Sequence, residues 1–74
     1  MKEIDLRFKD KAKQEVIYLL MDKDISDESR ELLEEVIVLG DILNKYCFLE
    51  ASQHLFAAKN CLVRDLRRLS GENQ

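Results

Sequence analysis

The chain has 74 residues, which limits it to one small domain with a core near the minimum that folds without further support. It contains no proline, only two glycines and 36% charged residues, a composition that argues against β-sandwiches, β-barrels and disordered linkers. The formal net charge of −3 gives no general attraction for nucleic acid or for an anionic membrane surface. We therefore predict an all-α protein with a single domain over residues 1–74.

The first predicted element is an amphipathic helix over about residues 3–22. Its apolar side chains recur at helical spacing on one face, while polar side chains fall mostly on the opposite face. The apolar set is Ile4, Phe8, Ala12, Val16, Leu19 and Leu20. A polar link follows, in which Ser26 is the better N-cap candidate for the next helix. A link this short predicts an antiparallel helical hairpin.

The second predicted element is a helical region over about residues 27–70. An apolar residue recurs at every third or fourth position of this region, which is typical of one helical face turned toward a core. This stripe comprises Leu32, Val36, Leu39, Leu43, Cys47, Ala51, Leu55, Ala58, Leu62, Leu66 and Leu69. As one helix the stripe would be roughly 57 Å long, against about 30 Å for the helix of about residues 3–22 that the segment before it can form. We therefore expect the chain to fold back on itself or to associate with a partner.

Residues 44–48 are the place where the second region could break. Asn44 could end one helix, and a turn here would produce a three-helix bundle. However, the four consecutive apolar residues 46–49 would make a poor exposed loop, and the stripe continues through them in phase. We therefore favour one long helix, with or without a kink, over the three-helix alternative. Gly40 predicts close packing of this helix against another backbone, and residues 71–74 form a polar tail.

The two cysteines lie in apolar stretches, and the start of the chain does not resemble a secretion signal. We predict that Cys47 and Cys61 are buried, reduced and structural, in a cytoplasmic protein. On a continuous helix they would share one face with His54 at seven-residue intervals. Seven residues rise about 10.5 Å, which is too far for these side chains to share a zinc ion or to form a Cys–His nucleophile pair. We therefore expect no metal site and no cofactor.

Function is predicted from the apolar stripe, since no catalytic motif is present and no apolar run is long enough to span a membrane. An apolar helical face that the chain cannot cover is typical of a protein interface. We predict a non-enzymatic helical interaction module, of the regulator, adaptor or chaperone type, that forms a homodimer or binds another protein. The expected contact residues are Tyr46, Phe48, Leu55, Phe56, Leu62, Val63, Leu66 and Leu69.

A basic cluster near the C-terminus supports an alternative function, that of a nucleic-acid-binding regulator. Its members are Lys59, Arg64, Arg67 and Arg68. Such side chains can contact phosphates, but no aromatic residue is interleaved with them, and the acidic remainder of the chain would repel a polyanion. Cations near a helix end are also favoured by the exposed carbonyl groups there. We therefore expect this cluster to stabilise the helix end.

Overall fold

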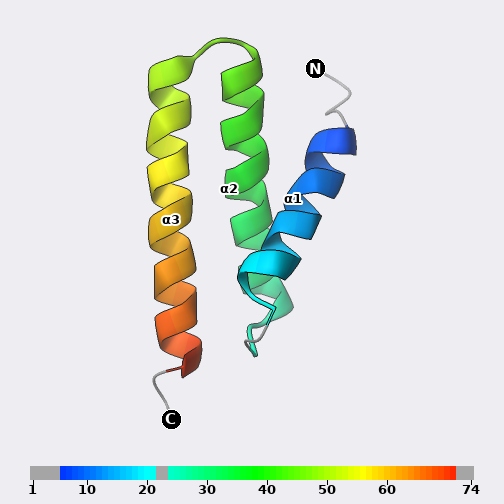
Figure 1. The fold of residues 1–74 in the computed structure, drawn as a ribbon, viewed down its shortest axis with the longest axis vertical. Helices are drawn as coiled ribbons and strands as arrows, with labels where there is room; N and C mark the ends of the chain where they lie inside the picture. The colour runs from blue at the N-terminus through cyan, green and yellow to red at the C-terminus, as the bar shows by residue number, and fades with distance from the viewer. Residues whose placement is uncertain (1–5, 22–23, 72–74) are drawn as a thin grey trace.

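The computed structural model of this chain describes residues 6–21 and 24–71 (Figure 1). Three helices follow one another along the chain: α1 (Leu6–Leu19), α2 (Asp27–Lys45) and α3 (Leu49–Gly71). α2 and α3 lie side by side and run in opposite directions, while α1 crosses α2 at an angle. The all-α prediction is confirmed for the described residues. The outer ends of the predicted N-terminal helix and most of the predicted polar tail lie outside them.

The predicted continuous helix over residues 27–70 is wrong. α2 ends at Lys45, the chain turns through residues 46–48, and α3 runs back along α2 (Figure 1). The three-helix alternative is therefore the architecture observed. Counted along the sequence, the apolar stripe keeps its helical spacing through the turn. Spacing alone therefore does not show that the chain turns here, because it does not reveal that one residue takes a left-handed conformation.

The turn between α2 and α3 is closed by backbone hydrogen bonds. The Cys47 N–H donates to Asn44 O at 3.0 Å, and the Phe48 N–H donates to Leu43 O at 2.9 Å. These two bonds form a Schellman motif, which needs a left-handed residue directly after the helix cap. Cys47 supplies it with φ of 66°. Glycine adopts this conformation freely, whereas for a residue with a Cβ it costs roughly 1–2 kcal/mol.

The link between α1 and α2 ends in the predicted N-cap. Ser26 has an extended backbone (φ −63°, ψ 155°), and its Oγ accepts a hydrogen bond from the Ser29 N–H at 3.2 Å. Asp27 and Glu28 occupy the first turn of α2, where the positive end of the helix dipole favours acidic side chains. The start of α2 is therefore determined by local chemistry.

The core lies where α1 crosses α2. Its fully buried apolar side chains recur every three or four residues on each side of the crossing: Ala12, Val16, Leu20, Leu33 and Ile37. α3 packs against the edge of this cluster through the partly buried Leu62, Val63 and Leu66. Within the described part of the chain, α3 contributes no fully buried apolar side chain of its own. Burial is therefore concentrated on the side of α2 that α1 covers.

The buried line of α2 differs by one residue from the predicted stripe. Leu33, Ile37 and Gly40 are buried, whereas Leu32 and Leu39 of the stripe are exposed. Consecutive residues of an α-helix are rotated by about 100°, so an apolar pair of neighbours offers two candidate faces. The packing of α1 decides which of the two is buried.

Gly40 is buried where α2 packs against α3. The buried Ser52 donates its hydroxyl hydrogen to Gly40 O at 3.2 Å, which satisfies this polar side chain inside the helix pair. A Cβ added to Gly40 would lie 3.4 Å from the Cβ of Leu55 and 3.7 Å from Cε1 of Phe56. α2 therefore packs against the first half of α3 at Gly40, but the nearest atoms belong to side chains of α3 and not, as predicted, to a backbone.

Candidate protein-interaction surface

The predicted interface residues divide into two groups in the structure. Leu62, Val63 and Leu66 pack against the core cluster, and Leu55 is half-buried beside Gly40. These four side chains hold α3 to the rest of the molecule. The exposed members of the predicted set are Tyr46, Phe48, Phe56 and Leu69.

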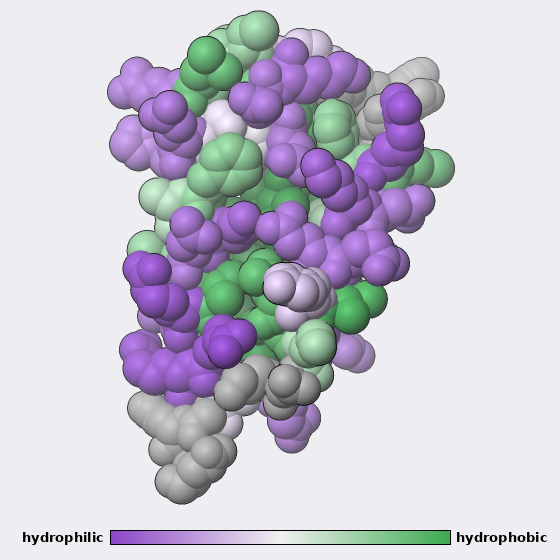
Figure 2. All heavy atoms as spheres, in the orientation of Figure 1, coloured by the Kyte–Doolittle hydropathy of each residue, from purple (hydrophilic) through white to green (hydrophobic). Residues whose placement is uncertain are grey.

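Exposed apolar side chains gather at the turn between α2 and α3. Tyr46 and Phe48 belong to the turn itself, and the side chain of Phe48 is 60% exposed. Leu49, the first residue of α3, is exposed beside them. Figure 2 shows hydrophobic residues at this end of the molecule, at the top of the view, next to a largely hydrophilic surface. The turn therefore offers aromatic surface to solvent.

A second apolar surface lies on the side of the α2–α3 pair that is turned away from α1. Glu34 directly follows the buried Leu33 and lies 3.8 Å from Lys13, so this flank of α2 faces α1. Leu32 directly precedes Leu33 and is therefore rotated to the opposite flank. Leu39, seven residues further on, lies at the edge of this flank, since it also lines a groove together with Lys9 and Lys13 of α1. These two leucines are 58% and 48% exposed.

α3 presents small and apolar residues on the same side of the pair. Arg67 directly follows the partly buried Leu66, and its Nη1 donates to Leu19 O at 3.0 Å, so this flank of α3 faces α1. Exposed residues that directly precede inward-facing positions lie on the other flank: Ala51, Ala58 and Leu69. We name the combined surface the hairpin face, defined by Leu32, Leu39, Ala51, Ala58 and Leu69.

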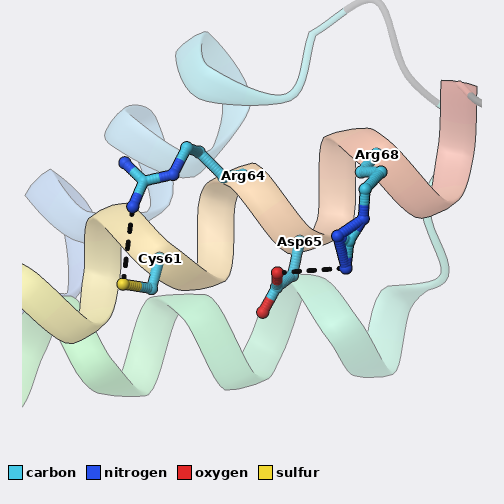
Figure 3. A network of polar contacts seen from close by, with 4 residues as sticks. All are labelled: Cys61, Arg64, Asp65 and Arg68. Atoms are coloured by element: carbon cyan, nitrogen blue, oxygen red, sulfur yellow. Dashed lines mark hydrogen bonds and ion pairs between the residues drawn. The ribbon is translucent and has the colours of Figure 1, made fainter.

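Charged residues border the hairpin face on both helices. Glu28 and Glu35 each lie one helical turn before an exposed leucine of α2, and both are exposed. On α3, Asp65 lies one turn before Leu69. Arg68 Nη2 is 3.2 Å from Asp65 Oδ1 on the surface of the helix (Figure 3). The face thus has an acidic border on α2 and an ion pair on α3.

The predicted nucleic-acid cluster makes its contacts within the chain. Lys59 Nζ lies 2.9 Å from Glu15 Oε2, which ties α3 to α1. Arg64 Nη2 lies 3.6 Å from Cys61 Sγ on the same helix (Figure 3). The other two arginines make the contacts with α1 and with Asp65 described above. All four cationic side chains therefore have a partner inside the molecule.

The prediction that the cysteines are buried is wrong, because Cys47 and Cys61 are both exposed and both are free thiols. Cys47 lies in the turn, where its backbone closes the Schellman motif, and Cys61 lies beside Arg64 on α3. The continuous face that would have joined them to His54 does not exist, since the first of the three is outside α3. Among residues 6–21 and 24–71, no group of three His, Cys, Asp or Glu side chains could hold a metal ion.

A shallow groove of about 520 Å³ lies between α1 and α2. Val38, Leu39 and Ile42 form its apolar part, and lysines of α1 and glutamates of α2 form its charged part. One pair of these charges, Lys13 and Glu34, is in contact across the groove at 3.8 Å. Leu39 belongs to both surfaces, so the groove adjoins the hairpin face.

Several exposed apolar residues lie outside the predicted interface. Leu32 and Leu39 belong to the predicted core-facing stripe but are exposed. The sequence does not reveal this exposure, because neighbouring positions of α2 are also apolar and could equally form the buried face. Ile17 and Tyr18 on α1, and Met21 just after it, are exposed and absent from the predicted apolar face. The signal for them is the unbroken apolar run over residues 16–21, because consecutive residues of a helix point in different directions and cannot all reach one core.

Comparison with known protein families, curated proteins and solved structures finds no match to this chain. None of the helices in the described ranges combines the length and the apolar character that crossing a bilayer requires.

Proposed function

We propose that this chain is a protein-interaction module that binds another protein chain through the hairpin face. The observation that supports this proposal is the exposure of three leucines, Leu32, Leu39 and Leu69, of which Leu69 is 64% exposed and Leu39 also borders the groove beside α1. Burying a leucine side chain contributes about 1.5–3 kcal/mol relative to leaving it exposed. A regulator, adaptor or chaperone role would use such a face, and pairing of two copies is its simplest form.

The shape of the hairpin face supports binding of a helix. Leu32 and Leu39 project from α2 two turns apart, while Ala51 and Ala58 on α3 are small and let another backbone approach. Large side chains beside small ones let two helical surfaces interdigitate. At one end the aromatic residues of the turn add side chains of the kind that often dominate interface energies, Tyr46 among them.

A double variant, Leu32→Glu with Leu39→Glu, tests this function. Both positions are exposed, so we expect the variant to keep the helical circular dichroism of the wild type. The new carboxylates would have to lose their hydration in any interface formed by this face, which opposes binding. We expect the wild type to exceed the monomer mass in light scattering, or to capture a protein from a cell extract, and the double variant to lose this association.

Ile17→Glu is the matched control, since Ile17 is 53% exposed on α1 and lies outside the hairpin face. This variant should associate as the wild type does. Equal association of the double variant and the wild type would contradict the proposal. A wild type that neither self-associates nor captures a protein would contradict it too.

A further inference from the structure

We propose that the occupant of the hairpin face is a second copy of this chain, related by a two-fold axis that runs along the hairpin. This inference rests on the proposed function and specifies its partner. In this arrangement α2 of one copy packs against α3 of the other, and the two hairpins form a four-helix bundle with α1 on the outside of each half. The argument rests on helix direction, on charge and on side-chain size.

The direction of the helices determines which segments would meet. α2 begins and α3 ends at the same end of the molecule (Figure 1). Ser29 of α2 lines one small depression there together with Leu66 and Leu69 of α3. A two-fold axis parallel to the helices keeps the equivalent ends of the two copies together. It therefore brings the first half of α2 opposite the second half of α3 of the other copy.

The charges of these two segments are complementary. The first half of α2 carries five acidic residues, at positions 27, 28, 31, 34 and 35, and the second half of α3 carries three arginines. In the described part of the chain, Glu28, Glu31 and Glu35 take part in no ion pair. Opposite charges on facing patches steer association and select the orientation of the partner. Glu31 and Glu35 line the groove that also contains Lys9 and Lys13 of α1, whereas for Glu28 a second copy would supply the nearby cation.

Glu28 and Arg68 are the two residues that this symmetry brings together. Glu28 lies in the first turn of α2 and Arg68 in the last turn of α3, so both are at the same end of the helix pair. Arg68 is held there by Asp65 at 3.2 Å. A guanidinium group has five N–H donors, so Arg68 can keep this contact and also bind a carboxylate of the second copy. The two-fold axis creates this contact twice in each dimer.

The apolar residues of the hairpin face fit the same arrangement. Gly40 contacts Leu55 and Phe56 across the hairpin, so Leu39, next to Gly40, lies close to the level of Ala58. Exchange of α2 and α3 by the two-fold axis therefore places a leucine of one copy near an alanine of the other. Matching a large side chain with a small one gives the interdigitation that close packing requires.

Charge exchange between copies tests this inference. The variants Glu28→Arg and Arg68→Glu each place like charges at both equivalent contacts, so self-association of either variant should weaken about tenfold or more. An equimolar mixture of the two variants should regain the wild-type association, because the new arginine of one then faces the new glutamate of the other. Sedimentation equilibrium at low salt measures all three samples. Recovery on mixing requires contact between chains, since neither variant carries both exchanged charges.

Arg67→Glu provides the matched control for the mixture. Arg67 donates to Leu19 O and so lies on the flank of α3 that faces α1, away from the hairpin face, so its reversal should not restore association with Glu28→Arg. A wild type that stays monomeric, or a mixture of the exchanged pair that does not recover, would overturn the inference. If the Leu32→Glu/Leu39→Glu variant dissociates while the charge variants associate as the wild type does, the proposed function stands and this dimer is wrong. The dimer is also wrong, and the proposed function also stands, if a monomeric wild type captures another protein that the double-leucine variant does not.

Discussion

The two ends of α2 are held in different ways. Near its start, α2 is packed against α1 by fully buried apolar side chains, among them Leu33 and Ile37. Near its end, α2 is joined to α3 by the packing of Leu55 and Phe56 at Gly40, by the hydrogen bond from the Ser52 hydroxyl to Gly40 O, and by the capped turn at Cys47. The first region is stabilised by burial, and the second mainly by backbone geometry.

This difference explains where the candidate interaction surface lies. A region stabilised by burial uses its apolar side chains inside the fold. A region held together by its backbone geometry can leave apolar side chains exposed to solvent, and Leu39, Phe48 and Leu49 are exposed in this way. One helix, α1, covers only one side of the hairpin, so an apolar sequence on both flanks of α2 leaves one flank exposed.

The largest expected effect is the difference in stability between mutations on the buried and on the exposed flank of α2. Leu33→Ala should lower the free energy of unfolding by about 2–5 kcal/mol, because Leu33 is fully buried and the change leaves a cavity. Leu32→Ala, at the next position, should change it by less than about 0.5 kcal/mol in the dissociated chain, since this side chain is exposed. Urea unfolding of both variants at low protein concentration measures the difference. Equal losses would mean that the buried line of α2 is assigned wrongly.

The next effect tests the packing of α3 against Gly40 of α2. Gly40→Leu should lower the free energy of unfolding by about 1–3 kcal/mol, because its side chain would collide with Leu55 and Phe56. Gly40→Ala is the matched control: its Cβ meets Leu55 at ordinary contact distance, and alanine favours the helix over glycine by up to about 1 kcal/mol. We therefore expect thermal unfolding to show a lower melting temperature for Gly40→Leu and a higher one for Gly40→Ala. A harmless Gly40→Leu would show that the helices are not in close contact there.

A smaller effect is expected at the turn. Cys47→Gly should raise the free energy of unfolding by about 1 kcal/mol, since glycine adopts the positive φ of this position without strain. Cys47→Ala removes the thiol but keeps a Cβ, so it should give no comparable gain. Urea unfolding compares the two. If Cys47→Ala raises the free energy of unfolding as much as Cys47→Gly does, strain in the backbone of the turn is not the cause of the gain.

The smallest effect concerns the ion pair that links α3 to α1. Lys59 and Glu15 are partly buried and 2.9 Å apart, so their coupling in a double-mutant cycle with alanine should be below about 1 kcal/mol. The coupling should shrink as salt is added, because screening weakens a partly exposed pair. Urea unfolding at low and high salt measures it. A coupling that salt leaves unchanged would indicate packing of the Lys59 stem rather than charge.

The sequence by itself determined the features that depend on neighbouring residues. The helical spacing of Ala12, Val16 and Leu20 predicts the buried face of α1, and all three are buried. Ser26 followed by acidic residues predicts the start of α2, and Ser26 caps it. Both features follow from local rules, namely the rotation of about 100° per residue and the hydrogen bond from a capping side chain.

Only the tertiary structure decided which apolar residues are covered. Leu32 and Leu33 are identical in chemistry, and the position of α1 buries the second and exposes the first. Likewise, the run over residues 46–49 has helical phase, yet the gain from packing α3 along α2 favours a turn there, with Cys47 in a left-handed conformation. Burial depends on contacts between distant segments, which local spacing does not contain. The hairpin face is the surface that remains when α1 has packed against one side only.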